Sequence, residues 1–312
     1  MICLDTVDTP ETGHLWAVIL AGGEGTRVAA FTRDSMGERV PKQYSSFGSG
    51  EPMLRWALRR AAAIVPAHRT LVVVAEQHRR FWKGLLVDLP QENVIVQPAN
   101  RGTAAGLLLP VLDILLRRDA AARVLVLPAD HHVGSEDVLR RALLAAAHAV
   151  RMPGAPLVLL GMAADDGDNE YGFILPAART PRDVQWVHSF VEKPEPERSR
   201  TLAAMGALVN SFIFTARGTT LVDLYKDALP ELVRSFVPVV AAGSPPVRLR
   251  QLYDGIPTHD FSRAVLERCP RSLAVLPVPS CGWSDLGTPS RLEHFLQHIP
   301  LEHSPIAVAV SA

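Results

Sequence analysis

Cysteine is scarce in this chain. Only Cys3, Cys269 and Cys281 occur among its 312 residues, and they form neither a close pair nor an evenly spaced framework. A fold held together by disulfides is therefore not expected. The simple interpretation is a protein of the reducing cytoplasm.

Long apolar runs are missing as well. No run approaches the roughly 20 residues that a helix needs to cross a bilayer. Residues 1–14 carry three acidic side chains, whereas a secretory signal has a basic start and a longer apolar segment. We therefore expect a loose N-terminal tail over residues 1–14 and no membrane partner.

Neither sign of charge predominates. The 32 lysines and arginines offset the 32 aspartates and glutamates, so no overall field attracts nucleic acid or an anionic membrane. Any phosphate-bearing ligand would need a local site. What the chain does have is 48% hydrophobic residues, which suits the core of one large α/β domain or two small ones.

In the first half of the chain, short apolar runs alternate with longer segments of helical spacing. The runs are rich in Val, Ile and Leu and are bounded by turn residues, which predicts buried strands. Strands are expected at 16–21, 70–75, 93–97, 123–128 and 156–161, and helices at 52–64, 79–86, 103–118 and 135–151. This alternation is typical of a mostly parallel sheet that helices cover on both faces.

The pattern changes after about residue 163. Extended pieces are expected at 172–175, 185–192, 211–215 and 272–278, and helices near 198–205, 221–229 and 258–268. No repeat and no long linker separates two domains, and residues 243–246 are interpreted as a loop. We predict a Rossmann-like α/β fold with a mixed, mainly parallel sheet flanked by helices. One domain would span 15–295, with a nucleotide half at about 15–162 and a second half at about 163–295, before a C-terminal tail at 296–312.

A glycine-rich loop directly follows the first predicted strand. It reads Gly-Gly-Glu-Gly-Thr-Arg over residues 22–27, and such glycines let backbone N–H groups approach phosphate oxygens closely. No Gly-Lys-Ser/Thr of a Walker A motif follows, and Val28 occupies the third glycine position of the dinucleotide pattern. The loop predicts a phosphate site, with an ordinary strand connection as the alternative.

Two aspartates stand where a metal could bind. Asp130 follows a near-continuous apolar strand, at the edge where open α/β sheets place their ligands, although it could instead cap the next helix. Asp285 lies in a tight turn, where it could simply bond its own backbone. His131 and His132 have no matching His or Cys at zinc-ligand spacing, and no serine nucleophile elbow is present.

Several motifs together resemble one family. Leu-Ala-Gly-Gly-Glu-Gly-Thr-Arg at 20–27, followed by Val-Pro-Lys-Gln-Tyr at 40–44, resembles the defining motif of the sugar-phosphate nucleotidylyltransferases. The resemblance runs from about residue 15 to 293 and is closest to mannose-1-phosphate guanylyltransferases. Further motifs in the family's order are Gln-Pro-Ala-Asn-Arg-Gly-Thr-Ala at 97–104, Leu-Pro-Ala-Asp-His at 127–131, Glu-Tyr-Gly at 170–172, Phe-Val-Glu-Lys-Pro at 190–194, Asn-Ser-Phe at 210–212 and Trp-Ser-Asp-Leu-Gly-Thr at 283–288.

The resemblance implies an enzyme that transfers a nucleotidyl group from GTP to mannose 1-phosphate, giving GDP-mannose and pyrophosphate. The sugar phosphate would attack the α-phosphate in line with help from Mg²⁺, and it would need no general base because it is largely ionised at neutral pH. A homodimer is left open. So are an adenylyl-, uridylyl- or thymidylyltransferase acting on glucose 1-phosphate and a catalytically silent regulatory relative that binds a nucleotide sugar. A dehydrogenase is disfavoured by Val28.

The resemblance also assigns roles to residues that match the motifs. The expected catalytic residues are Arg27, Lys42 and Asp130, and the expected Mg²⁺ ligands are Asp130 and Asp285. The nucleotide would be bound by Leu20, Ala21, Gly22, Gly23, Gly25, Thr26, Gln97, Arg101, Gly102 and Thr103. The sugar phosphate would be bound in the second half by Gly172, Glu192, Lys193 and Asn210.

The residues alone leave plainer interpretations open for some of these positions. Thr103 could be the N-cap of a helix, and Glu192 and Lys193 could form a surface ion pair. The motif at 210–212 lacks the family's usual glycine, which predicts an altered sugar pocket. Since the chain ends soon after residue 293, we expect no further isomerase or assembly domain.

Overall fold

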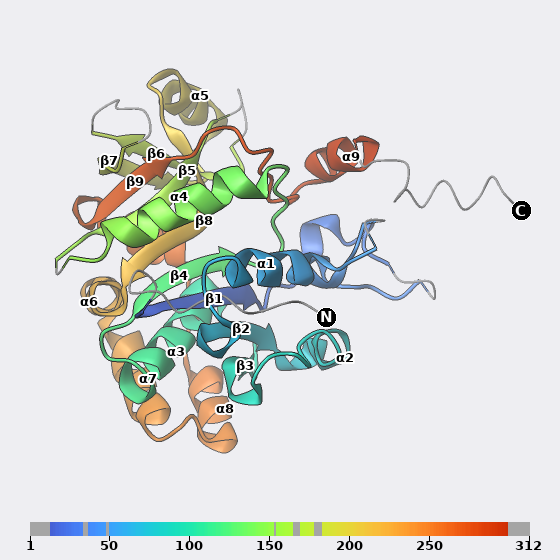
Figure 1. Cartoon of the computed structure of the whole chain (residues 1–312), viewed down its shortest axis with the longest axis vertical. Helices are drawn as coiled ribbons and strands as arrows, with labels where there is room; N and C mark the ends of the chain where they lie inside the picture. Colours follow the sequence, from blue (N-terminus) through green and yellow to red (C-terminus); the bar gives the residue numbers. More distant parts are fainter. Residues whose placement is uncertain are drawn as a thin grey trace, which may run out of the picture.

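One sheet runs through the described part of the computed structural model, which comprises residues 13–33, 37–47, 50–152, 154–164, 169–177 and 183–298. Nine strands form it in the order β3-β2-β1-β4-β8-β5-β9-β7-β6 (Figure 1). Their bounds are β1 (Leu15–Ala21), β2 (Thr70–Ala75), β3 (Val94–Gln97), β4 (Arg123–Pro128), β5 (Leu157–Met162), β6 (Gly172–Pro176), β7 (Gln185–Glu192), β8 (Leu208–Arg217) and β9 (Leu273–Pro277). Most of the two expected tails lies outside the described residues.

The sheet is mixed, with most strands running the same way. Strands β3, β2, β1 and β4 pair in parallel, as do β5 and β9. Strand β8 is antiparallel to β4, β5 and β6, and β7 is antiparallel to β6 and β9. Among the described strands only β7 and β8 therefore oppose the rest, which confirms the expected mixed, mainly parallel sheet.

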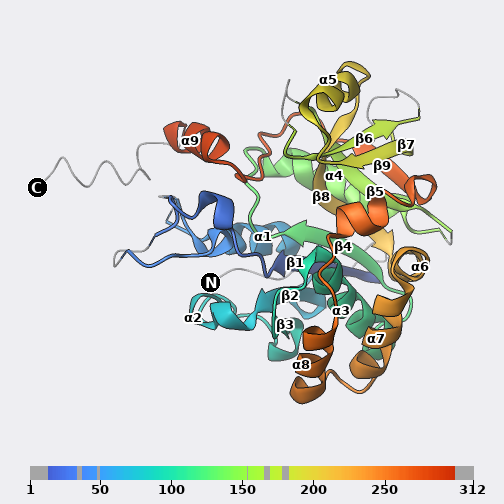
Figure 2. The same cartoon turned by 180° about the vertical axis from the view of Figure 1, so that it is seen from behind.

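Helices cover both faces of the sheet (Figures 1 and 2). They are α1 (Met53–Ala62), α2 (Arg79–Trp82), α3 (Gly102–Arg117), α4 (Glu136–Ala149), α5 (Pro196–Ala204), α6 (Gly218–Ala228), α7 (Pro230–Ala241), α8 (Pro246–Gly255) and α9 (Pro289–Gln297). Alternate side chains of each buried strand point to opposite faces. In β1, Trp16 and Val18 join the core with α3, α6, α7 and α8, whereas Ala17 and Ile19 join the core with α1 and α4.

The predicted elements agree closely with the structure in the first half and less closely in the second. Every strand expected before residue 163 lies within a residue or two of its observed bounds. The helix expected at 258–268 is wrong in type and length, because only a π-helical turn forms over Ser262–Leu266. Helices α7, α8 and α9 were not predicted. The loop expected at 243–246 does connect α7 to α8, although its last residue, Pro246, is already the first residue of α8.

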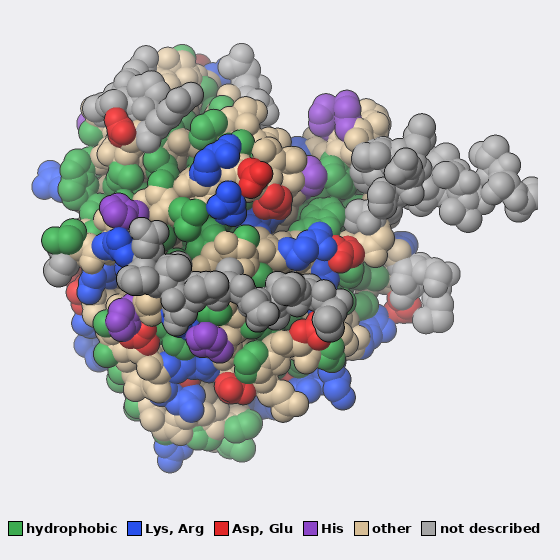
Figure 3. All heavy atoms as spheres, viewed as in Figure 1, with side chains coloured by type: hydrophobic (Ala, Val, Ile, Leu, Met, Phe, Trp, Pro, Cys, Tyr) green, Lys and Arg blue, Asp and Glu red, His purple; other side chains and the backbone are tan. Residues whose placement is uncertain are grey.

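On the face seen in Figure 3, basic and acidic side chains are interspersed, in keeping with their equal totals. None of the helices described is long and apolar enough to cross a membrane.

Candidate active site

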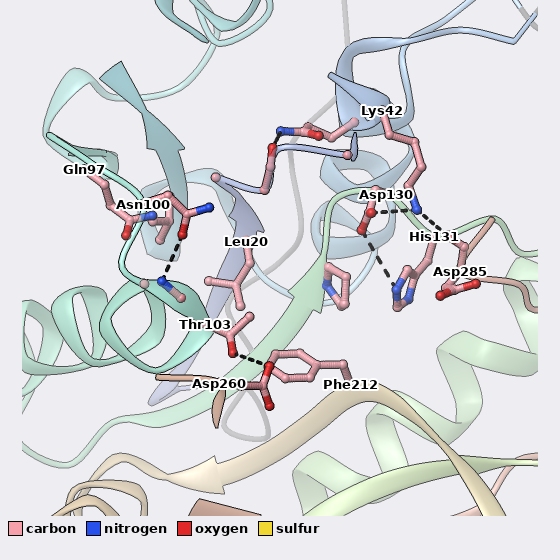
Figure 4. Close-up of a pocket in the computed structure, with 18 of the residues that line it drawn as sticks. Leu20, Lys42, Gln97, Asn100, Thr103, Asp130, His131, Phe212, Asp260 and Asp285 are labelled. Atoms are coloured by element: carbon pink, nitrogen blue, oxygen red, sulfur yellow. Dashed lines mark hydrogen bonds and ion pairs between the residues drawn. The ribbon is translucent and has the colours of Figure 1, made fainter. Parts of the chain in front are cut away.

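A pocket of about 710 Å³ opens beyond the carboxyl ends of β1, β3 and β4. Parallel sheets place ligands at this edge because loops from several strands meet there. In Figure 4, Lys42, Asp130 and Asp285 lie on one side of the pocket and Gln97 and Asn100 on the other. The predicted residues in its lining are Leu20, Gly22, Gly23, Gly25, Arg27, Lys42, Gln97, Gly102, Thr103, Asp130 and Asp285.

Three residues predicted to bind the nucleotide lie outside this lining. Ala21 is buried, and its carbonyl oxygen accepts hydrogen bonds from Gln43 Nε2 at 2.9 Å and the Tyr44 hydroxyl at 3.0 Å. Arg101 donates through Nε to the main-chain oxygen of Tyr253 at 2.6 Å. Thr26 is exposed in the turn after Gly25. Ala21 and Arg101 therefore hold the loops in place.

The glycine loop packs against the segment that carries Lys42. Gly25 has a φ of 60°, and a Cβ atom there would stand 2.9 Å from the Lys42 main-chain nitrogen. A larger residue would be strained in this conformation and would push the two segments apart. The Gln43 side chain completes the contact by donating to the Gly23 carbonyl oxygen at 2.8 Å. The family motif at 20–27 and its continuation at 40–44 thus form one structural unit.

Lys42 links the two aspartates. Its side chain is 5% exposed, and Nζ lies 2.7 Å from Asp130 Oδ2. Nζ also donates to the main-chain oxygen of Asp285. Reciprocal backbone hydrogen bonds of 2.9 and 3.1 Å between His132 and Ser284 hold the two aspartate loops together. The fold therefore brings Asp130 and Asp285 to one pocket, which sequence could not demonstrate.

The Asp285 carboxylate is held from three sides. Oδ1 accepts hydrogen bonds from Arg291 of α9 at 2.6 Å, from the Tyr171 hydroxyl at 3.1 Å and from the Gly287 main-chain nitrogen at 2.9 Å. The bond to Gly287 is the turn contact that the sequence also allowed. The other contacts orient the carboxylate with respect to the pocket.

Both carboxylates favour the ionised form. Burial opposes ionisation of Asp130, but the charge and hydrogen bond of Lys42 help to hold its pKa below the usual range. Burial likewise opposes ionisation of Asp285, and Arg291 together with Lys42 lowers its pKa. Burial also lowers the pKa of His131 to about 4, so this ring is neutral near pH 7 and accepts a hydrogen bond from Trp283 at 3.2 Å.

The donor atoms suit Mg²⁺ only together with a substrate. No group of three or more His, Cys, Asp or Glu that could hold a metal occurs among the described residues. Two carboxylates leave most of an octahedral shell to phosphate oxygens and water, which is the arrangement that Mg²⁺ commonly adopts. The residues therefore fit Mg²⁺ carried in on a nucleotide better than a metal bound by protein alone.

Three of the four predicted sugar-phosphate residues cluster beside the pocket. Gly172 of β6 pairs with Glu192 of β7, and a Cβ atom on Gly172 would stand 2.5 Å from Glu192 Oε2 and 3.4 Å from Asn210 Cβ. Lys193 comes directly after Glu192. Its side chain is exposed, and its main-chain nitrogen donates to the Tyr171 main-chain oxygen at 3.1 Å. None of the four belongs to the lining of the 710 Å³ pocket.

The carboxyl group of Glu192 lies in an unusual environment. Its Oε2 is buried and has no hydrogen-bond partner within the described residues. Burial, reinforced by Asp260, raises its pKa to about 7. A buried polar atom without a partner is costly and suggests a position that a ligand group completes. A simple surface ion pair with Lys193, the plainer interpretation, does not describe this carboxyl group.

A family model described as nucleotidyl transferase matches residues 16–300 of the chain. The chain belongs to the nucleotidyl transferase family. Mannose-1-phosphate guanylyltransferase ManC of Salmonella typhimurium is 30% identical over 302 residues, which cover 92% of this chain and 60% of that protein. Alginate biosynthesis protein AlgA of Pseudomonas aeruginosa is 28% identical over 290 residues, covering 87% and 56%. This nucleotidyl transferase therefore spans less than two thirds of the length of these relatives.

A solved structure shows the same fold. The Thermus thermophilus protein named mannose-1-phosphate geranyltransferase is 27% identical, with a TM-score of 0.77 over 92% of this chain and 80% of that one. The resemblance inferred from the motifs, both to the family and to mannose-1-phosphate guanylyltransferases, is thereby confirmed.

Some pocket residues of this nucleotidyl transferase were not predicted. They include Gln43, Asn100, His131, Phe212, Thr258 and Asp260. Phe212 has a φ of 56°, a conformation that favours glycine, in the motif that lacks the family's usual glycine. Thr103 is the second residue of α3 and not its N-cap, so that interpretation was wrong; its hydroxyl donates to Asp260 Oδ2 at 3.2 Å.

Proposed function

We propose that this nucleotidyl transferase joins GTP to mannose 1-phosphate, releasing GDP-mannose and pyrophosphate. The observation that carries the proposal is the ion pair between the buried Lys42 and the partly exposed Asp130 beside a glycine loop, with Asp285 on the same wall. These groups match the needs of a reaction between two phosphates, namely cations for the triphosphate and carboxylates for a metal. The names of ManC and of the Thermus thermophilus protein support mannose 1-phosphate as the acceptor.

The nucleotide would lie across the pocket with its base beside Gln97 and its phosphates toward the glycine loop. Backbone N–H groups of residues 22–26 would bind phosphate oxygens, and the N-terminus of α3 at Gly102 would add the positive end of its helix dipole. Arg27, which lines the pocket while paired with Glu170 at 2.7 Å, and Lys42 would neutralise the departing pyrophosphate.

Asp130 and Asp285 would hold Mg²⁺. When bound, the ion supplies positive charge that stabilises the phosphate oxygens while pyrophosphate leaves the α-phosphate. In the protein alone, Lys42 neutralises Asp130. Substrate phosphates would attract this ammonium away from Asp130 and so expose the carboxylate.

The acceptor would bind at the Gly172–Glu192–Asn210 cluster, next to Phe212 in the pocket wall. The unpaired Glu192 Oε2 would accept a hydrogen bond from a sugar hydroxyl, and the Lys193 ammonium would bind the phosphate. No protein base is needed, because the acceptor phosphate is already ionised. With its pKa lowered to about 4, the buried His131 is a weak base, which agrees with a reaction that uses no histidine base.

The division into a nucleotide half and a sugar-phosphate half, the cytoplasmic location and the homodimer stay predictions. Both halves contribute strands to one sheet, and β8 of the second half pairs with β4 of the first. Sedimentation of the purified chain would establish its oligomeric state.

The proposed function predicts a narrow substrate pair. Purified protein with Mg²⁺ is expected to release pyrophosphate from GTP with mannose 1-phosphate, and much more slowly from ATP, UTP or dTTP or with glucose 1-phosphate. A coupled pyrophosphate assay over all pairs would measure this. Another active pair would overturn the assigned substrates but keep the reaction class, and silence of folded protein with every pair would favour a regulatory relative.

The raised pKa of Glu192 predicts that the free energy of unfolding depends on pH. Its pKa of about 7 in the folded protein lies above its ordinary value of 4.5, so the folded state keeps a proton that the unfolded chain releases. On account of this group, the free energy of unfolding falls as pH rises from about 4.5 to 7, and then levels off. Glu192→Gln removes this titration, so its stability relative to wild type is expected to rise over that range by at most roughly 3 kcal/mol.

Urea unfolding of wild type and Glu192→Gln at several pH values between 4.5 and 8 would measure the difference. Glu197→Gln, at an exposed position of α5, is the matched control. Parallel stability curves for wild type and Glu192→Gln would contradict a raised pKa.

A further inference from the structure

Part of the pocket wall comes from the segment between Tyr253, near the end of α8, and Phe261, before the π-helical turn; its Thr258 and Asp260 line the pocket. Both ends of this segment are bound to the loop at 97–104. Two contacts involve Tyr253: its hydroxyl donates to Gln97 Oε1 (3.2 Å), and its main-chain oxygen accepts from Arg101 Nε (2.6 Å). The other three start from main-chain nitrogens: His259 donates to the Arg101 main-chain oxygen (3.3 Å), Ala104 to the His259 main-chain oxygen (3.1 Å) and Phe261 to Thr103 Oγ1 (2.7 Å). Five hydrogen bonds therefore join the two segments on the base side of the pocket.

The two segments also approach each other closely at Gly102. Gly102 has a φ of 79°, and a Cβ atom there would stand 2.2 Å from the His259 oxygen. Only glycine allows the two segments to approach so closely. Tyr253 itself is fully buried, and its ring packs edge-on against Phe236 at 5.8 Å.

The Tyr253 hydroxyl determines which end of the Gln97 amide faces the pocket. A carboxamide oxygen can only accept a hydrogen bond, so the phenol donates and Oε1 is engaged. The NH₂ group then lies against Gly22, where a Cβ atom would stand 2.7 Å from Nε2. A rotated amide could donate to the phenol, but the buried phenol hydrogen would then lose its acceptor at a cost.

We propose that Tyr253 is a positioning residue that sets base specificity by fixing the Gln97 amide with its NH₂ group toward the base. This inference rests on the proposed nucleotidyl transfer. An NH₂ group requires an acceptor on the base edge. Guanine offers O6 at the position where adenine offers an amino group, so the fixed amide favours guanine and opposes adenine.

Tyr253→Phe tests the inference, because it removes the hydroxyl and keeps the ring. Both orientations of the Gln97 amide then become accessible, and the ratio of kcat/KM for GTP to that for ATP is expected to fall by about tenfold. The change should appear mainly in the KM for the nucleotide, with the KM for mannose 1-phosphate unchanged. ITP shares O6 with GTP but lacks the 2-amino group, so kcat/KM for ITP should fall as much as kcat/KM for GTP.

Tyr225→Phe is the matched control. Tyr225 is equally buried and donates to the Ala104 main-chain oxygen at 2.8 Å, so its variant also loses a buried hydroxyl at the same loop without touching Gln97. Its GTP to ATP ratio should stay at the wild-type value. An unchanged ratio in Tyr253→Phe, or an equal fall in both variants, would overturn the inference.

A second variant tests the same contact between residue 97 and the base edge without altering residue 253. In Gln97→Glu, one carboxylate oxygen still accepts from Tyr253 and the other faces the base as an acceptor. The GTP to ATP ratio is expected to fall by at least about tenfold, and an unchanged ratio would exclude base reading by residue 97. If wild type itself shows no turnover with GTP, the proposed function fails; if wild type prefers GTP and Tyr253→Phe keeps that preference, only the present inference fails.

Discussion

Asp130→Asn is expected to lower kcat/KM for nucleotidyl transfer by about 10³-fold, with the protein still folded. The substitution keeps the size of the side chain and removes the charge that would hold Mg²⁺ on the triphosphate. It also leaves the buried Lys42 ammonium with the main-chain oxygen of Asp285 in place of a full counterion. The loss should appear in kcat at saturating nucleotide, and binding of Mn²⁺ in the presence of GTP should weaken in parallel.

Asp137→Asn is the matched control for this experiment. Asp137 also pairs with a basic residue, Arg140, at 3.3 Å, but its side chain is 76% exposed on α4. The control should keep wild-type turnover and Mn²⁺ binding. Wild-type rates in folded Asp130→Asn would contradict the assignment of Asp130 as a metal ligand.

The first half of the fold was predictable because its strands are short and, apart from β3, almost entirely buried. The apolar run at 124–128 within β4 has no polar face, so it stands out from the surrounding helices. Helix α7 was missed for the opposite reason. It begins at Pro230 and contains Pro238, and proline is the residue that usually ends a helix. Pro230 is tolerated because the N–H group that proline lacks is not needed in the first turn of a helix.

The candidate site was predictable as a set of residues but not as an arrangement. Motif order named Lys42, Asp130 and Asp285, yet their contacts depend on the pairing of His132 with Ser284, which no local pattern reveals. Arg291 was missed because it lies on α9, which was itself not predicted. The raised pKa of Glu192 likewise depends on burial, which is a property of the folded chain.

The base wall shows most clearly why sequence alone is insufficient. Thr258 and Asp260 line the pocket from a segment more than 150 residues away from the loop that they face. The predicted helix at 258–268 placed these residues in a regular element. In the structure Asp260 instead precedes the π-helical turn, accepts from the Arg263 main-chain nitrogen at 3.0 Å and turns toward Thr103.

Lys42→Met is expected to lower kcat by about 10²- to 10³-fold while raising the affinity of the nucleotide-free protein for Mn²⁺. Methionine fills a similar volume and carries no charge. The triphosphate would lose a cation that neutralises its leaving group, whereas Asp130 would lose the ammonium at 2.7 Å that competes with a metal. These opposite effects separate a role in transfer from a merely structural one, because a disordered site would lose both turnover and metal binding.

Turnover in both directions and Mn²⁺ titration followed by electron paramagnetic resonance would measure the two effects of Lys42→Met. Lys226→Met is the control, since Lys226 also pairs with an aspartate, Asp223 at 2.8 Å, but its side chain is 58% exposed. Undiminished kcat would exclude Lys42 from charge neutralisation at the triphosphate. Weaker Mn²⁺ binding in the variant would instead show that Lys42 orders the carboxylates, so the ion pair would be part of a preformed metal site.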